Sequence, residues 1–452
     1  MTLGQPPRSS RGLIGVLGAQ AASLSANRLL LIAVPWFVLT TTGSVAKTGL
    51  IAFCQITPFV LAQALAGPLI DRVGPRRISI AGDVVSTSAA VTVPLLYAAD
   101  ALPLWALMAL MAVLGAGEGP ASAAKSVFIP SVTRAAGAPL ERGTGLTTAV
   151  ERTATVVGPA VAGVVVAAFG GPRAFWLAAV LFGLAAVITA ATLADPVPDP
   201  AERATTEIDG YFARLREGAT FLRHDGLLRA IVAMLIATNL LDQAFIAVLL
   251  PVWARASGHG AETVGLVVSI FGATSILGAL VAAKYGTRLP RRAMYMTGLV
   301  IGGVPRFAAM ALGLPLWAVL ATFAVGGVGS GFINPILGAV SYERIPTRLL
   351  GRVRALTTAL TWSGIPFGGL FGAAVIAMAG VSGALWIVGG CYLVAIVLPA
   401  LRPEWSQMRR HLSSARVSTE PARITAERSR QTTYTLSGAD ALPKNPPESG
   451  GG

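Results

Sequence analysis

The second half of this chain repeats features of the first half, in the same order, at an offset of 210 to 216 residues. The matches are Pro35 with Pro251, Gly49-Leu50 with Gly265-Leu266, Arg76-Arg77 with Arg291-Arg292, Pro130 with Pro346, Arg142 with Arg352, and Leu146-Thr147-Thr148-Ala149 with Leu356-Thr357-Thr358-Ala359. Each match alone is weak, but a constant order is hard to obtain by chance. We therefore expect two related halves, with a site on the axis between them.

The composition predicts that both halves lie in a membrane. Hydrophobic residues make up 54% of the chain and charged residues only 12%, whereas a soluble domain carries about a quarter charged residues. A helix needs about 20 apolar residues to cross a bilayer. The apolar runs predict an all-α membrane protein with twelve spanning helices, at about 12–41, 46–70, 77–99, 103–131, 143–169, 173–194, 226–254, 262–287, 292–313, 315–341, 353–379 and 381–401.

Basic residues gather in every second loop between these spans. They are Arg72, Arg76, Arg77, Arg134, Arg142, Arg288, Arg291, Arg292, Arg344, Arg348, Arg352 and Arg354. Arg and Lys mark the cytoplasmic side of a membrane protein, so both termini are expected in the cytoplasm and the chain in the plasma (inner) membrane. This topology accounts for the net charge of +14, and no nucleic-acid partner is expected.

Five segments follow from this pattern. Residues 1–11 are the cytoplasmic N-terminus, and 12–194 and 226–401 are two six-helix bundles. Residues 195–225 form a polar cytoplasmic linker, in which apolar side chains from Ile208 to Leu222 recur at helical spacing and predict an amphipathic helix. Residues 402–452 are rich in Ser, Thr, Arg and Pro, so we expect a disordered cytoplasmic tail.

The loop after the second span reads GPLIDRVGPRR. It resembles the signature loop of the major facilitator superfamily, in which the defined positions are Gly67, Asp71, Arg72, Gly74, Arg76 and Arg77. The resemblance covers roughly residues 12 to 401. It implies twelve transmembrane helices in two pseudo-symmetric six-helix bundles, the major facilitator fold.

The resemblance also implies a conformational latch at this loop. In the family the aspartate, here Asp71, faces the positive N-terminus of helix eleven and holds the outward-facing state. Gly67 permits close helix contact and Gly74 a tight turn. Arg76 and Arg77 belong to the latch or only set the topology. The matching loop of the second half has Thr287-Arg288 and no aspartate, so one half carries the latch.

Span five contains Gly158, Pro159 and Gly163, and resembles a degraded form of the Gly-Pro motif of proton-coupled exporters. Span eleven contains Gly364, Pro366 and Gly368. Small residues with proline allow helices five and eleven to pack closely and bend where the halves meet. The chain is similar in texture to the twelve-helix drug or metabolite:proton antiporters, in the branch with macrolide and siderophore exporters.

Charged residues inside the spans cost about 2.5–3.5 kcal/mol each on insertion and are candidates for function. They are Arg28, Asp83, Glu118, Lys125, Glu151, Arg152, Asp242, Lys284 and Arg306. Asp83 is expected to pair near the arginines of the signature loop, and Lys284 and Arg306 to reach the headgroups. Glu151 and Arg152 diverge by about 100° around their helix, so we expect one of them to face a cavity.

In the family, helices one, four, seven and ten line the cavity. Glu118 and Asp242 lie on two of these helices, and Glu151 is the next acid; these three are the candidates for carrying a proton, the expected driving ion. The candidates for the cavity and substrate are Asn27, Arg28, Arg152, Asn239, Gln243 and Asn334. Arg28 requires an anion, which is Glu118, Asp242, Glu151 or the substrate.

Other functions find no support in the sequence. Gly326-Gly327-Val328-Gly329 lacks a Walker lysine, the three histidines lie far from Cys54 and Cys391, and no nucleophile–base pair appears. We therefore expect no enzyme, no cofactor, no metal and no disulfide, and a monomer whose partners are a small-molecule substrate and the lipid bilayer.

The sequence thus predicts a secondary active transporter, a proton-coupled exporter of an amphipathic small molecule that works by alternating access. Uptake, or flipping of a lipid-like solute, is the alternative with the same fold. A non-transporting receptor or scaffold is a third possibility, against which the buried carboxylates and the intact loop argue. The identity of the substrate stays open.

Overall fold

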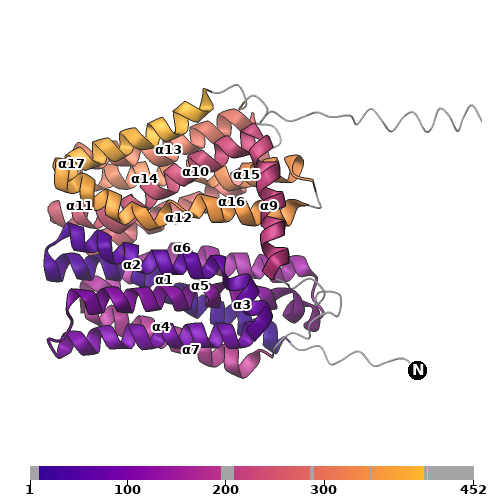
Figure 1. Cartoon of the computed structure of the whole chain (residues 1–452). Coiled ribbons are helices and arrows are strands. Elements are labelled where there is room, and N and C mark those ends of the chain that lie inside the picture. Colours follow the sequence, from indigo (N-terminus) through magenta and orange to yellow (C-terminus); the bar gives the residue numbers. More distant parts are fainter. Residues whose placement is uncertain (1–9, 195–207, 286–289, 347–348, 402–404, 406–452) are drawn as a thin grey trace, which may run out of the picture. The chain divides into compact units, whose positions relative to one another are not determined.

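A computed structural model describes residues 10–194, 208–285, 290–346, 349–401 and Trp405. These residues belong to one compact unit, Met1–Met408, and the second unit, Arg409–Gly452, lies outside them. Throughout the described part the regular secondary structure is helical, which confirms the predicted all-α fold (Figure 1).

The first half consists of α1 (Arg11–Thr42), α2 (Val45–Ala64), α3 (Ala66–Val73), α4 (Pro75–Ala98), α5 (Leu104–Ala135), α6 (Leu140–Phe169) and α7 (Gly171–Thr192). The second half consists of α9 (Ile208–His224), α10 (Gly226–Ala244), the π-helix η1 (Phe245–Leu249), α11 (Leu250–Ala256), α12 (Ala261–Tyr285), α13 (Arg291–Ala311), α14 (Leu316–Gly331), α15 (Ile333–Arg344), α16 (Leu350–Trp362) and α17 (Ile365–Ala400).

Ten helical stretches of the described chain are long and apolar enough to cross a membrane. One of them, Leu356–Pro399, has 44 residues and turns at Gly380, where φ is +67°. Only glycine adopts this left-handed conformation without strain, so the stretch contains two crossing segments. α13 is not among the ten and carries three arginines, Arg291, Arg292 and Arg306. The arrangement is consistent with twelve spans.

Several spans are interrupted, which the apolar pattern alone did not predict. The span expected at 46–70 is two helices, because α2 ends at Ala64 and α3 begins at Ala66. Gly74 (φ +98°) then ends α3, and Pro75 occupies the first position of α4, where a missing N–H costs nothing. Span seven contains the π-helix η1, and span ten breaks at Phe332 between α14 and α15.

Helix contacts within the two halves correspond to each other. In the first half α5 packs against α2 and α4, and in the second half α14 packs against α12 and α13. In each half, therefore, the fourth span packs against the second and the third span of that half. The sequence repeat is therefore a structural repeat.

The contact between the halves follows the same symmetry. α2 packs on α17, and α12, the counterpart of α2, packs on α6. A Cβ atom on Gly49 would collide with the Gly369 carbonyl oxygen, and one on Gly265 would collide with the Pro159 carbonyl oxygen. The repeated glycine, Gly49 in one half and Gly265 in the other, thus lets backbones meet across the interface.

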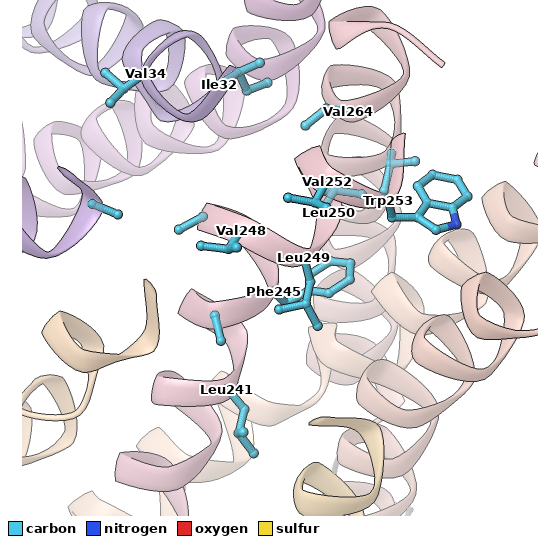
Figure 2. Packing of buried hydrophobic residues seen from close by; sticks show 14 of the residues in the cluster. Ile32, Val34, Leu241, Phe245, Val248, Leu249, Leu250, Val252, Trp253 and Val264 are labelled. Carbon is cyan, nitrogen blue, oxygen red and sulfur yellow. The ribbon is translucent and has the colours of Figure 1, made fainter. Parts of the chain in front are cut away.

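One large hydrophobic core extends through both halves. Figure 2 shows the part around η1, where Phe245, Val248 and Leu249 lie among buried apolar side chains of α1 and α12, including Ile32 and Val264. The core positions η1 and the adjoining end of α10, which separate the two cavities described below.

The linker and the tail have one described feature each. α9 lies in the segment predicted as an amphipathic helix, and its Leu222 is buried in a cluster with Leu228 and Val232 of α10 and with Ile345, Leu349 and Val353. Trp405 falls within the segment expected to be disordered but is fully buried, with its ring 5.9 Å from that of Tyr295 on α13. The other residues of 402–452 and residues 195–207 lie outside the described residues.

Candidate functional site

A cavity of 400 Å³ lies between the two halves. Its lining is mostly apolar, as is common for small-molecule sites. Its polar and aromatic side chains are Asn27 and Arg28 from α1, Thr48, Gln55, Phe59 and Gln63 from α2, Glu118 and Ser122 from α5, Gln243 from α10 and Trp362 from α16. The ring of Phe59 stacks on that of Trp362 with 6.3 Å between centroids, so an aromatic pair from opposite halves borders the cavity.

Glu118 is the acid of this central cavity, and Asn27 is its hydrogen-bond donor. Glu118 is only 7% exposed. The glycines on either side of Glu118 are sites of close helix packing. Gly119 abuts the Phe59 carbonyl of α2, and Gly117 abuts Gly82 of α4. The close approach of α2 and α4 encloses the carboxylate.

Arg28 forms no ion pair with any of the three carboxylates that were candidates for its anion. Its guanidinium donates to the Thr155 hydroxyl at 3.2 Å, and its stem packs on Gly158 of α6. Among the described residues it has no ion pair within 4.0 Å, and its buried Nε has no hydrogen-bond partner. The guanidinium of Arg28 can therefore donate further hydrogen bonds in the cavity, and it interacts electrostatically with Glu118 and Glu151.

A second charged cluster is buried within the first bundle. The Lys125 ammonium contacts the Asp83 carboxylate at 2.7 Å and the Ser23 hydroxyl at 3.3 Å. Both charged side chains are at most 2% exposed. Asp83 thus pairs with Lys125 of α5 and not with the arginines of the signature loop, and the pair ties α4 to α5 close to Glu118.

Glu151 and Arg152 do not line the central cavity in this structure. Both are exposed, and Glu151 accepts a hydrogen bond from Gln20 at 3.1 Å. The expectation that one of them faces the cavity stays a prediction.

Asp242 lies in a different cavity from Glu118. A pocket of 270 Å³ inside the second bundle is lined by Asp242, Asn239 and Asn334, together with Arg306. Arg306 forms an ion pair with Asp242. Arg306 is 7% exposed, so the expectation that it reaches the headgroups is wrong. Gln243, the neighbour of Asp242, faces the central cavity, since adjacent helical residues point about 100° apart.

The signature loop lies at one end of the first bundle. Asp71 is exposed on α3, and it has no hydrogen bond or ion pair with any described residue. Arg76 donates to the Ala190 carbonyl at 2.8 Å, near the end of α7, where a cation satisfies a free carbonyl. Arg72 and Arg77 are exposed, and the space beside Gly67 is open. The contact of Asp71 with helix eleven stays a prediction.

The glycines of spans five and eleven lie at two kinds of contact. Gly163 of α6 packs on Ala261 and Gly265 of α12, across the interface between the halves. Gly364 and Gly368, by contrast, pack against α10 of their own half. Pro159 lies within α6, and Pro366 lies in the first turn of α17. In span eleven the glycine that contacts the other half is Gly369, the residue after Gly368.

Sequence reasoning missed the contribution of α2 to the central cavity. Gln55, Phe59 and Gln63 line it, and they recur every four residues, which places them on one helix face. Two glutamines at this spacing in an apolar span were a usable signal. Trp362 had no comparable signal, because its position depends on the break between α16 and α17.

Two helical bundles related by an internal repeat, with a cavity between them, define the architecture of a secondary transporter. A profile of the Major Facilitator Superfamily matches residues 16–241 and again residues 232–436, one match for each half. The chain belongs to the major facilitator superfamily.

Individual relatives and structures agree with this assignment. The chain is 30% identical to the multidrug efflux pump Tap of Mycobacterium tuberculosis over 397 residues, which cover 86% of this chain and 93% of that protein. It is 21% identical to macrolide efflux protein A of Streptococcus pyogenes, over 85% of this chain and 95% of that one. The crystal structure of the nucleoside transporter NupG shares the fold, with a TM-score of 0.70 at 14% identity, over 88% of this chain and 98% of that one.

Proposed function

We propose that this protein exports an amphipathic small molecule, such as a drug or a secreted metabolite, in exchange for protons. The relatives whose names describe efflux of multiple drugs and of macrolides support the direction. The central cavity supports the substrate class, because its apolar lining is interrupted by a few amides, one acid and one guanidinium. Such a lining suits a compound with a large apolar body and a few polar groups.

The observation that carries the proton coupling is the environment of Glu118. Its carboxylate is buried at the central cavity, and its direct partner is the neutral amide of Asn27. A carboxylate held by a neutral amide can exist in both protonation states, because an amide offers an N–H to the ionised form and a carbonyl oxygen to the acid. A tight ion pair would instead hold the charged state.

The contacts between the halves support a cycle of alternating access. Arg255 of α11 donates to the Leu39 carbonyl of α1, and Gly49 abuts Gly369. These residues lie toward the helix ends opposite the signature loop. We assign this end to the outside, on the basis of the basic loops at the other end. The described state is then closed to the outside, so substrate reaches the cavity from the cytoplasm or inner leaflet.

In this cycle the substrate and the proton use the cavity alternately. Substrate binding beside Glu118 favours loss of its proton to the cytoplasm. The halves then rock about the α2–α17 and α6–α12 contacts, and a proton from the outside neutralises Glu118 and promotes release of the substrate.

Accumulation of a fluorescent amphipathic dye, with and without the protein, at two external pH values tests the proposal. Cells that lack their own efflux pumps should accumulate less dye with the protein, and the difference should grow at the lower external pH. Higher accumulation with the protein would show uptake, and a difference independent of pH would contradict proton coupling.

A further inference from the structure

The pocket inside the second bundle has a lining of its own. Its residues come from α10, η1, α12, α13, α14, α15 and α17, and none of the described residues lines both this pocket and the central cavity. The two cavities lie on different faces of span seven, which here passes from α10 into the π-helix η1. Single π-turns are frequent at functional sites. The proton-coupled export proposed above assigns this pocket no role.

Arg306 lies in this pocket within a cage of aromatic rings. Its guanidinium carbon is 4.7 Å from the ring centroid of Phe245, 4.9 Å from that of Phe307 and 5.4 Å from that of Tyr392. The ring of Phe271 is 6.0 Å away, and the carboxylate of Asp242 completes the set. Aromatic faces around a carboxylate are the groups with which proteins bind organic cations.

The carboxylate, and not the arginine, is the more open member of the pair. The side chain of Asp242 is 36% exposed, against 8% for Arg306. The second carboxylate oxygen, Oδ2, is 3.5 Å from the Tyr392 hydroxyl, a distance at which a hydrogen bond is weak. A ligand in the pocket therefore meets an accessible carboxylate oxygen, the rings of Phe245 and Phe323, and the polar side chains of Ser330 and Asn334.

We propose that this pocket is a second binding site, for a compact organic cation, and that Arg306 is the internal cation that neutralises Asp242 while the site is empty. The arginine avoids the cost of a buried unpaired carboxylate. A ligand cation competes with Arg306 for Asp242 and uses the same aromatic faces. The Arg306 Nε, which is buried and has no partner among the described residues, is consistent with a side chain whose hydrogen bonding is incomplete.

The competition predicts opposite effects of the two partners. Arg306→Met keeps an unbranched stem and removes the competing charge, so cation affinity should rise by about tenfold, close to the lower end of the effects measured for close charge pairs. Asp242→Asn should lower it by about tenfold for the same reason. The double variant should bind more tightly than Asp242→Asn, because it also lacks the repelling guanidinium, and more weakly than Arg306→Met, because it lacks the carboxylate. A purely structural ion pair would give losses in both single variants.

The test is equilibrium binding of benzyltrimethylammonium to the purified full chain in detergent, without a proton gradient, so that its outcome does not depend on coupling or on transport direction. Neopentylbenzene, in which carbon replaces the nitrogen, is the neutral competitor and should not displace the cation. Arg291→Met and Glu343→Gln are the matched controls, because they break an arginine–carboxylate pair outside both cavities. Binding in the controls should equal that of the wild type.

Asn334→Asp provides a second arm that leaves the pair in place. It adds a carboxylate to the pocket and should tighten cation binding, which decides the question if Arg306→Met does not fold. If Arg306→Met folds, unchanged or weaker cation binding in this variant would overturn the proposal. If it does not fold, unchanged or weaker cation binding in Asn334→Asp would overturn the proposal. Displacement of the cation by neopentylbenzene as effective as displacement by unlabelled benzyltrimethylammonium would also overturn the proposal, because the site would then not require a charge. Loss of cation binding in Glu118→Gln would overturn it as well, because the cation would then bind in the central cavity.

Discussion

The side-chain amide of Asn27 on α1 donates a hydrogen bond to the carboxylate of Glu118 on α5. The guanidinium of the neighbouring Arg28 donates a hydrogen bond to the hydroxyl of Thr155 on α6. The acid of the central cavity is therefore in direct contact with a neutral donor, and the cations Lys125 and Arg28 act on it only at longer range. This arrangement lets Glu118 gain and lose a proton without breaking an ion pair.

Asn27→Leu should move the pH dependence of transport upward. The change removes the donor that stabilises the ionised carboxylate, so loss of the proton requires a higher pH. A hydrogen bond to a charged group contributes about 1.5–3 kcal/mol, and one pH unit corresponds to about 1.4 kcal/mol, so the shift should be about one to two units. A pH–rate profile measures it.

Asn239→Leu is the matched control for this shift. Its amide donates to the Thr361 carbonyl at 2.8 Å, away from Glu118, so its profile should keep the wild-type midpoint. An unshifted profile in Asn27→Leu, at normal protein level, would show that Glu118 does not set the pH dependence.

Arg28→Ala distinguishes an electrostatic role from direct substrate binding. Arg28 lies within electrostatic range of Glu118 and Glu151, so its loss should favour the protonated acid and raise the pH optimum for all compounds. If Arg28 instead binds the substrate, only anionic compounds should lose affinity. Profiles on one cationic and one anionic compound separate the two, and unaltered profiles on both would remove Arg28 from the mechanism.

The sequence was sufficient to predict the fold because the fold depends on features that repeat. The helices follow from apolar runs and the two halves from the repeated motifs, and Gly49 and Gly265 even have equivalent contacts across the interface. The breaks at Leu65 and Phe332 and the π-helix η1 were not predicted. They depend on how neighbouring helices fit, which hydrophobicity along one chain does not describe.

The site was predicted less completely. The ion-pair partner of a buried charge depends on how each helix is rotated about its axis and how deep the charge lies in the membrane, and the sequence does not give these. The sequence showed that mid-span charges need partners, but not that Asp83 selects Lys125 or that Asp242 selects Arg306. One feature of the surroundings of Glu118 could have been predicted. Lys125 is seven residues, or about two helical turns, further along the same span, so the two side chains share a helix face. The separation of Glu118 and Asp242 into two cavities had no such signal.

Lys125→Met should destabilise the protein strongly. It leaves Asp83 buried without its cation, which costs about 3–5 kcal/mol in comparable buried pairs. The double variant Asp83→Asn, Lys125→Met removes both charges and should recover most of the loss. Thermal unfolding of the purified proteins in one detergent gives the comparison. Equal loss in the single and double variants would show that the side chains matter through packing and not through charge.

Asp71→Asn should slow transport strongly and leave substrate binding nearly intact. The reason is that the signature loop is expected to control the equilibrium between states, and Asp71 lies outside both cavities. Turnover in proteoliposomes and equilibrium binding of the same compound give the two quantities. Glu141→Gln, an exposed acid in the first turn of α6, is a suitable control. Normal turnover in Asp71→Asn would refute the latch.

The most direct test of proton-driven export is the response of Glu118→Gln to an imposed pH gradient. Proteoliposomes are loaded so that the gradient alone can drive uphill movement of an amphipathic dye, and downhill exchange of the same dye is measured in parallel. Wild-type protein should accumulate dye against its gradient, whereas Glu118→Gln should catalyse only downhill exchange, because glutamine keeps the hydrogen bond to Asn27 but carries no proton. Uphill accumulation by Glu118→Gln at the wild-type level would contradict the account.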